Sequence, residues 1–218
     1  MPTIPFTIAL VTAPTADVVT YDQAKAQCAL EHDLHRTMLE LMRDAAVAEL
    51  DPAAGGWLGR ALRPQTWELR LAAFPCGEIR LPHPPLIAIT SLKYDDGDGV
   101  ERTLVENTDF VVVGRGGKRC QSVVPAYGLS WPAARCQPES VRIRYSCGHP
   151  PAAAAQGETP AVLETLPAAI RQWLLLEIGT LYANRESTVV GNTTPVRLPH
   201  VDASLDKFRP YWTPPQLP

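Results

Sequence analysis

Hydrophobic residues follow three different patterns along the chain. Between residues 20 and 50 they recur every three or four positions, between 65 and 147 they alternate with polar residues, and between 168 and 184 they recur at helical spacing again. The first and third patterns are typical of helices, and alternation is typical of half-buried strands. The chain is therefore predicted to carry a β-rich segment between two helical segments.

Two helices are predicted before residue 51. The segment Thr20-Tyr21-Asp22-Gln23 fits a capping box, in which the side chains of Thr20 and Gln23 each satisfy a free backbone amide, and a short helix to about Leu30 follows. A second helix with one apolar stripe is predicted up to about Leu50. The residues of this stripe are Leu34, Met38, Leu41, Ala45 and Ala48.

The stretch between the second helix and Pro64 is expected to bend. Asp51-Pro52-Ala53-Ala54-Gly55-Gly56 interrupts the helical pattern, because proline and glycine disfavour a helix interior. Residues 57–62 then form a bend or restart a helix.

Short strands are predicted between residues 65 and 147, because the period of the pattern changes to two. Trp67, Leu69 and Leu71 fall on one face of the first strand. The segment Asp95-Asp96-Gly97-Asp98-Gly99 has the composition of a hairpin turn. We expect a compact antiparallel sheet or a small barrel. Further strands are predicted at Glu78–Leu81, Ala88–Tyr94, Val100–Leu104, Phe110–Val113, Arg119–Val124 and Val141–Tyr145.

A third helix is predicted from about Pro167 to Asn184, after a linker rich in alanine and proline. Leu175 and Leu176 widen its apolar surface beyond one stripe, so the helix needs apolar partners on more than one side. We expect it to lie centrally in a helical bundle or to contact a neighbouring subunit. The candidate contact residues are Trp173, Leu175 and Leu176.

The segment after Thr188 is polar and rich in proline, and it has too few apolar side chains to form a core of its own. We therefore expect it to become ordered only on a partner. Aromatic residues are its expected anchors, because buried aromatic side chains dominate interface energies. The predicted docking residues are Arg197, Val201, Leu205, Phe208, Tyr211 and Trp212.

The composition indicates a soluble globular protein, since 45% of the 218 residues are hydrophobic and 20% are charged. A formal net charge of -3 argues against a protein whose affinity comes from neutralising many phosphates. The five cysteines include no C-x-x-C pair, which favours reduced thiols in a cytosolic protein. No export signal and no membrane anchor are expected, because no apolar stretch approaches the length of a membrane span.

Three short motifs are too incomplete to predict a catalytic, cofactor or metal site. His32-x-x-His35 could place two imidazoles on one helix face, but exposed histidines are favoured because no third ligand is near. The run from Asp95 to Asp98 resembles a calcium loop, yet Val100 stands where an oxygen ligand is needed. The segment Gly128-Leu129-Ser130-Trp131 lacks the G-x-S-x-G pattern of a catalytic serine.

One glycine-rich loop is basic, from Gly114 to Arg119. It matches no phosphate-binding motif and lies between predicted strands, so a turn with a solvated rim is favoured. Weak contact with nucleic acid is the alternative, and it would use Arg115, Lys118 and Arg119.

A second basic pair lies on a predicted strand. The alternation from Val141 to Tyr145 places Arg142 and Arg144 on the same strand face. Such a face is usually hydrated, and in a ring it could line a channel or contact the next subunit.

Four longer runs occur in a distinctive order. They are Leu62-Arg63-Pro64-Gln65-Thr66-Trp67-Glu68-Leu69, Glu78-Ile79-Arg80-Leu81-Pro82-His83-Pro84-Pro85-Leu86, Pro125-Ala126-Tyr127-Gly128-Leu129-Ser130-Trp131-Pro132-Ala133-Ala134-Arg135, and Leu166-Pro167-Ala168-Ala169-Ile170-Arg171-Gln172-Trp173 with Tyr182-Ala183-Asn184-Arg185-Glu186 at the end of its helix. With the two N-terminal helices, they resemble the head-tail connector (adaptor) family of long-tailed bacteriophages, prophages and gene transfer agents. The resemblance spans Thr20 to Trp212. The chain departs from the family pattern by an insertion at Asp51–Gly56 and by an extension before Thr20.

The resemblance implies an α+β fold, a small helical bundle with an inserted antiparallel β-rich subdomain and an extended C-terminal tail. Residues 1–63 would supply the N-terminal helices, and residues 158–187 the long helix that completes the helical body. Residues 64–148 would form the β-rich insertion, 149–157 a linker and 188–218 the docking segment.

The function that the resemblance implies is structural and not enzymatic. The protein would form a ring, dodecameric like the portal protein beneath it, in the neck of a virion assembled in the bacterial cytoplasm. Its partners would be further copies of itself, the portal protein, a stopper or tail-terminator protein and double-stranded DNA in transit, with no cofactor and no membrane. Two other function classes stay open: a nucleic-acid-binding module that uses loop 115–119, and a small metal-dependent hydrolase.

Overall fold

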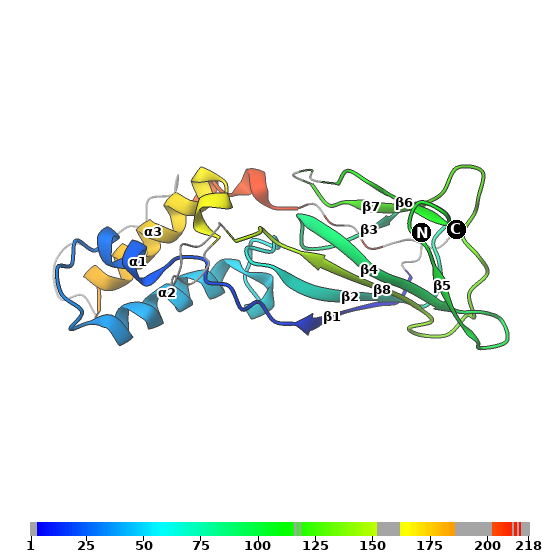
Figure 1. Ribbon diagram of the computed structural model, residues 1–218, viewed down its shortest axis with the longest axis horizontal. Coiled ribbons are helices and arrows are strands. Elements are labelled where there is room, and N and C mark those ends of the chain that lie inside the picture. The colour runs from blue at the N-terminus through cyan, green and yellow to red at the C-terminus, as the bar shows by residue number, and fades with distance from the viewer. Residues whose placement is uncertain are drawn as a thin grey trace.

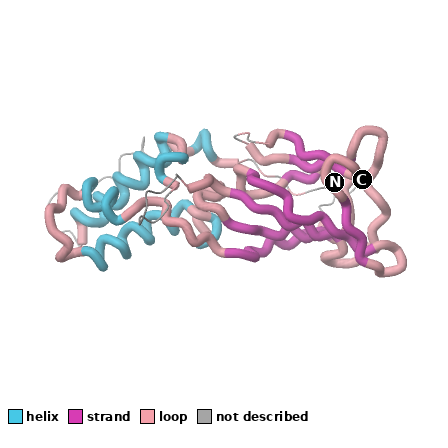
Figure 2. The backbone as a smooth tube through the Cα atoms, viewed as in Figure 1, coloured by secondary structure: helices cyan, strands magenta, loops and turns pink. Residues whose placement is uncertain are grey.

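The computed structural model describes residues 4–115, 117, 119–151, 162–185, 202–210, 212 and 214. Figure 1 shows an elongated molecule, with the helices gathered at one end and the strands at the other. Colouring by secondary structure separates the same two parts, which we call the helical half and the β half (Figure 2). The fold class is α+β, as predicted from the sequence.

The helical half contains α1 (Tyr21–Gln27), α2 (Arg36–Leu50) and α3 (Ala168–Ala183). The predicted capping box starts α1: the Gln23 amide donates to Thr20 Oγ1 at 3.2 Å, and the Thr20 amide donates to Gln23 Oε1 at 2.9 Å. All three helices contribute to one hydrophobic core, together with short 3-10 helices at Leu163–Thr165 and Asp206–Phe208. None of the helices in the described part of the chain has the length and hydrophobicity that crossing a membrane requires.

Helix α2 has two apolar faces, which corrects the prediction of a single stripe. Its buried residues are Leu39, Ala46, Val47 and Leu50. The predicted stripe lies on the opposite side, where Leu34 is 82% exposed and Leu41 is 70% exposed. Hydrophobic periodicity detects both stripes but does not say which one faces the core. The outward stripe on α2 consists of Met38, Leu41, Ala45 and Ala48, of which Met38 and Ala48 are half-buried, and Leu34 continues it in the turn before the helix. We call these five residues the α2 ridge.

The β half consists of two antiparallel sheets. The five-stranded sheet has the order β1-β2-β8-β4-β5, and the three-stranded sheet has the order β3-β7-β6. The strands are β1 (Phe6–Thr12), β2 (Gln65–Leu71), β3 (Ile79–Arg80), β4 (Leu86–Asp95), β5 (Glu101–Leu104), β6 (Phe110–Val113), β7 (Ser122–Pro125) and β8 (Val141–Cys147).

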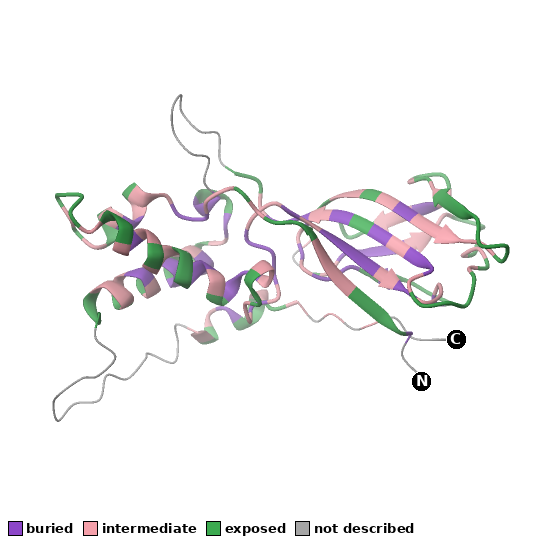
Figure 3. Ribbon diagram, turned by 90° about the horizontal axis from the view of Figure 1, so that it is seen from below, coloured by how far each residue is buried: buried purple, intermediate pink, exposed green. Residues whose placement is uncertain are grey.

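A second hydrophobic core lies in the β half, formed by the inward faces of both sheets. The predicted face of β2 is buried: Trp67 pairs with Tyr145, and Leu69 pairs with Ile143 of β8. Figure 3 shows buried segments along the strands and mainly exposed loops at the far end of the β half. On one side of the sandwich, β5 and β6 are joined by a tight turn in which the Asp109 amide donates to the Val105 carbonyl at 2.9 Å.

One strand was not predicted from the sequence, and residues 57–62 adopt the first of the two expected forms, a bend. Strand β1 was not predicted, although Phe6, Ile8 and Leu10 alternate with Thr7 and Ala9; it is an edge strand that pairs only with β2 among the described strands. Residues 57–62 form no helix and instead cross from one half to the other, with Leu58, Ala61 and Leu62 buried.

A buried polar network joins the two halves where the sequence suggested an insertion. The carboxylate of Asp51 is fully buried and accepts hydrogen bonds from the Ala53 amide (3.1 Å), Arg63 Nε (3.1 Å) and Gln65 Nε2 (3.0 Å). Gln65 Oε1 in turn accepts a bond of 3.1 Å from Trp67 Nε1. The network links the end of α2 to the start of β2, so the insertion forms part of the connection between the halves.

Candidate functional site

The C-terminal strap, which we define as residues 202–210 and 212, packs along the chain's own surface. Leu205 is buried in the helical core, and Phe208 packs against the same core. Trp173 Nε1 donates to Asp202 Oδ1 at 2.7 Å, and Arg60 Nε donates to the Phe208 carbonyl at 3.1 Å. The strap is therefore fixed to the helical half and to the connection that leads into the β half.

The strap ends at the open side of the β sandwich. Trp212 Nε1 donates to the Arg80 carbonyl on β3 at 2.7 Å, and the Trp212 ring meets the Phe6 ring of β1 edge to face at 5.1 Å between centroids. β1 and β3 are edge strands, one in each sheet, so Trp212 covers the seam between them.

These contacts change the expectation for the predicted docking residues. Leu205, Phe208 and Trp212 pack on their own chain, because the two cores provide apolar surface that the sequence did not reveal. Docking of the half-buried Phe208 and Trp212 on a portal protein or a neighbouring subunit stays a prediction. The other predicted docking residues, Arg197, Val201 and Tyr211, lie outside the described residues.

The predicted contact surface on α3 is divided between interior and exterior. Trp173 is buried in the helical core, so the expected subunit contact does not hold for this residue. Leu175 is half-buried and Leu176 is 39% exposed. Both leucines line a shallow hollow of about 410 Å³ between α1 and α3, which we call the α1–α3 groove. Its lining residues are Gln23, Gln27, Leu163, Glu164, Ala168, Arg171, Gln172, Leu175 and Leu176.

Arg142 and Arg144 lie on the outward face of the five-stranded sheet, and both have carboxylate partners within the chain. Arg142 Nη2 lies 2.7 Å from Asp95 Oδ1 and 3.0 Å from Glu101 Oε2. Arg144 Nη2 lies 2.7 Å from Glu68 Oε2. Positive charge on this face is therefore matched by negative charge, and a role of the two arginines in a subunit contact stays a prediction.

Glu68 is the most enclosed carboxylate of this face. Burial alone raises the pKa of its carboxyl, but hydrogen bonds from Arg70 and Arg144 outweigh burial, and the pKa lies below its ordinary value. Arg70 Nε lies 2.7 Å from Glu68 Oε1, and Arg70 Nη1 reaches Glu139 at 2.9 Å. Glu68 is thus a charged, paired group with no sign of acid–base function.

The basic loop between β6 and β7 is held as a turn. Gln121 Nε2 donates to the carbonyls of Gly117 (3.0 Å) and Arg119 (2.7 Å), while Gln121 Oε1 accepts from the Leu86 amide at 2.9 Å. Arg115 forms an ion pair with Glu106. Arg115 and Arg119 are exposed, and Lys118 lies outside the described residues. The loop thus has the structure of a turn, as the sequence favoured, and part of its charge is neutralised.

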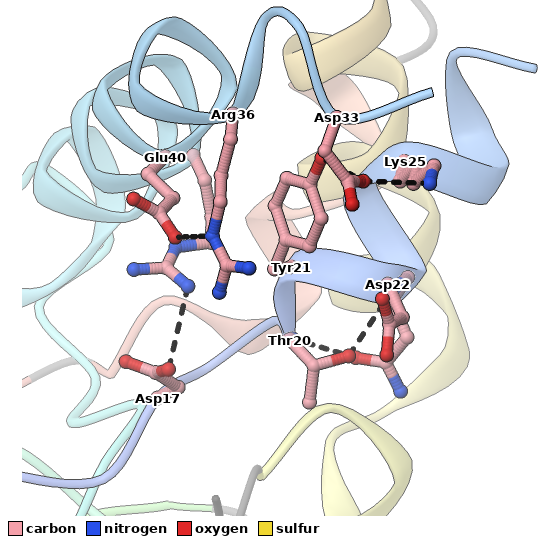
Figure 4. Close-up of a pocket in the computed structure, with 10 residues that line it drawn as sticks. Asp17, Thr20, Tyr21, Asp22, Lys25, Asp33, Arg36 and Glu40 are labelled. Carbon is pink, nitrogen blue, oxygen red and sulfur yellow. Dashed lines mark hydrogen bonds and ion pairs between the residues drawn. The ribbon is translucent and has the colours of Figure 1, made fainter. Parts of the chain in front are cut away.

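A hollow of about 810 Å³ between α1 and α2 is lined almost entirely by polar and charged side chains (Figure 4). Across it, Lys25 Nζ lies 2.7 Å from Asp33, and the Tyr21 hydroxyl donates to Asp33 at 2.9 Å. Arg36 pairs with Glu40 at 3.0 Å at the other side of the hollow, and Arg43 reaches Asp17 at 3.3 Å. Figure 4 shows Lys25 directed toward Asp33 and Arg36 directed toward Glu40, so these charges are paired within the chain.

The two segments considered as metal motifs, and set aside in the sequence analysis, form no metal-ligand group among the described residues. Within the described ranges, no three His, Cys, Asp or Glu side chains are placed to share an ion. His32 and His35 lie with ring centroids 5.8 Å apart at the start of α2. The segment from Asp95 to Gly99 forms the predicted hairpin turn between β4 and β5, in which Asp96 accepts from the amides of Asp98 and Val100.

Sequence reasoning missed the seam contact of Trp212, the Asp51 network and the outward position of the α2 ridge. The first two join residues far apart in the chain, so no local spacing signals them. A usable signal existed for the third, since residues 39, 46, 47 and 50 form a second apolar stripe on α2.

Comparison with known proteins gives matches among solved structures alone. No family model matches the chain, and no curated protein matches it. A chain in the virion of a native gene transfer agent particle is 18% identical with a TM-score of 0.66, covering 95% of this chain and 97% of the other. A chain in the neck of an empty particle, computed with C6 symmetry, is 19% identical with a TM-score of 0.65, covering 97% and 100%. A chain in the neck of a native particle, computed with C12 symmetry, is 17% identical with a TM-score of 0.62, again covering 97% and 100%. Over nearly its whole length, the protein therefore has the fold of chains found in the virion and neck of gene transfer agent particles.

Proposed function

We propose that this protein is a structural component of the neck of a phage-like particle, where it serves as the head-tail adaptor. The observation that carries the proposal is the full-length fold similarity to chains of gene transfer agent virions and necks, with TM-scores from 0.62 to 0.66. Helices, both sheets and the connections between them are all included, because at least 95% of this chain is covered. A shared small domain alone would not produce such coverage.

The proposed assembly is a ring of twelve copies that joins the portal protein to a stopper or tail-terminator protein. Twelvefold symmetry of a similar neck supports this number. A ring needs heterologous contacts, in which one surface of each subunit meets a different surface of the next. The helical bundle would form the body of the ring, and the β half would extend from it.

The side-chain chemistry of the described residues supports a structural role rather than an enzymatic one. The charged side chains around the α1–α2 hollow are paired with one another. Burial raises the pKa of the Cys120 thiol to about 11 and raises that of Cys147 further, so both thiols stay protonated and unreactive at neutral pH.

Passage of DNA through the ring without tight binding fits the charge distribution. The net charge is -3, and Arg115, Arg142 and Arg144 each have a carboxylate partner in the chain. A surface that neutralised many phosphates would bind DNA strongly and in a salt-dependent way. We therefore favour the adaptor over a nucleic-acid-binding module.

The test is the mass and shape of the purified chain, alone and mixed with the portal protein of the same particle. We expect rings in negative-stain images and a mass of about twelve subunits, either for the chain alone or on the portal. A chain that stays monomeric in both samples would refute the proposal. Salt-sensitive binding of the isolated chain to DNA would favour the nucleic-acid-binding alternative instead.

A further inference from the structure

The α2 ridge is an apolar surface without a partner in the described chain. Leu34 and Leu41 are 82% and 70% exposed, and Ala45, one turn after Leu41, is exposed as well. The outward face of a surface helix normally carries polar residues, because the apolar face is the one that packs on the core. In α2 the core-facing stripe is complete without the ridge. Exposed apolar surface of this regular kind marks a contact with another molecule.

A complementary surface lies on the other side of the helical half. The α1–α3 groove is hollow and has Leu175 and Leu176 in its lining. Figure 1 shows α2 along one side of the helical half and α1 with α3 along the other. Because the buried stripe of α2 faces the shared core, the ridge points away from α3 and from the groove. One side of the subunit therefore carries a convex apolar surface, and the opposite side carries a concave one.

The arrangement fits the geometry of a closed ring. Successive subunits of a twelvefold ring are related by rotations of about 30°, so the two contact surfaces of each subunit lie on nearly opposite sides. The groove is lined by both Arg171 and Glu164, and Asp44 beside the ridge is paired with Arg43, so shape and apolar surface rather than charge support the match. We propose that the α2 ridge of one copy docks into the α1–α3 groove of the next copy. The inference rests on the proposed ring and names the surfaces that form it.

Two full-length variants test the pairing. The ridge variant carries Leu34→Glu and Leu41→Glu, and the groove variant carries Leu176→Glu; all three positions are exposed, so both variants should fold with an unchanged melting temperature. The control is Leu129→Glu, which changes a leucine of 54% exposure in the β half. We expect the control to form rings as the wild type does. Each of the other two variants should be monomeric, on its own and with portal protein.

Mixing the two variants distinguishes this pairing from any other. The mixture holds one intact ridge, on the groove variant, and one intact groove, on the ridge variant. Native mass spectrometry at ten times the wild-type assembly concentration should show one-to-one heterodimers and no larger species. Absence of heterodimers would overturn the pairing of ridge with groove.

The outcomes separate this inference from the proposed function. Rings formed by both the wild type and the ridge variant would overturn the inference and leave the adaptor proposal intact. A wild type that forms no ring alone or with portal protein would overturn both. If the Leu129→Glu control also forms no rings, an added negative charge anywhere on the surface prevents assembly. That result would also overturn the inference.

Discussion

Trp212 Nε1 donates a hydrogen bond of 2.7 Å to the carbonyl oxygen of Arg80, which lies 132 residues earlier in the chain. The bond joins the C-terminal strap to β3, and the edge-to-face contact of the same indole with Phe6 joins it to β1. A single side chain therefore contacts an edge strand of each sheet. Because the strap is also fixed in the helical core by Leu205, it connects the two halves independently of the Asp51 network.

Replacing Trp212 with alanine should lower the free energy of unfolding by about 2 kcal/mol, since it removes a half-buried aromatic ring and a hydrogen bond. Trp212→Phe keeps most of the ring contact and should cost about 1 kcal/mol. Urea unfolding followed by circular dichroism measures both values. Equal stability of wild type and Trp212→Ala would mean that the seam contact contributes nothing in solution.

Replacing Asp51 with alanine should lower the free energy of unfolding by about 3 kcal/mol, more than the Trp212 variants do. The N–H donors of Arg63 and Gln65 would lose their buried acceptor. Asp51→Asn keeps one acceptor oxygen, so its stability should lie between those of Asp51→Ala and the wild type. The measurement is the midpoint of thermal unfolding for the three proteins. A ranking in which asparagine is worse than alanine would contradict the network described here.

Glycine is required at position 56, because a Cβ there would lie 2.2 Å from the carbonyl carbon of Leu50. Gly56→Ala should therefore destabilise the protein by roughly 2 kcal/mol or more as the backbone shifts. Gly77→Ala is the matched control, since a Cβ at that position meets no atom within 4 Å. The two variants are compared by urea unfolding, and similar values for both would show that the turn after α2 adapts without cost.

Stability should fall with pH between about 6.5 and 4, before most carboxylates titrate. Burial lowers the pKa of His149 to about 4, with a further contribution from Arg60, and burial also lowers the pKa of His83. The folded protein keeps these rings neutral, while the unfolded chain binds protons below about pH 6.5. Their contribution is thus fully present above pH 6.5 and is lost as the pH falls toward 4.

For His149 the expected loss across this range is about 2 kcal/mol. Urea unfolding at pH 7.5, 5.5 and 4.5 measures it, and His149→Phe should give a flatter dependence because the titrating group is gone. Asp95, whose pKa is lowered chiefly by its hydrogen bond from Arg142, loses its contribution only below about pH 4 and does not interfere. An identical pH dependence in wild type and variant would exclude His149 as the cause.

The sequence predicted those elements whose pattern is set locally. The capping box at Thr20 and the alternation of Trp67, Leu69 and Leu71 both depend on neighbours within a few residues, and both appear in the structure as expected. β1 was missed even though it carries the same kind of local signal, since Phe6, Ile8 and Leu10 alternate with Thr7 and Ala9. The orientation of α2 was missed because a helix with two apolar stripes has two equivalent solutions until its tertiary partners are known.

The candidate contact residues on α3 differ in burial in a way that the sequence did not indicate. Leu176 is 39% exposed and its subunit contact stays a prediction, whereas Trp173, three residues earlier, is buried in the helical core and donates to Asp202 of the strap. Whether an aromatic side chain packs on its own chain or on another depends on which surfaces the fold leaves uncovered. That information is absent from the spacing of residues in the tail.

The double attachment between the halves has a mechanical consequence. Two halves joined at one point can rotate about that point when a force acts on one end. Two halves joined at two separated points move together as one rigid body. The Asp51 network and the Trp212 contact are two such fastenings, one at the centre of the molecule and one along its β half. In the ring that we propose, such a subunit would transmit a force from one end to the other without bending at the connection between its halves.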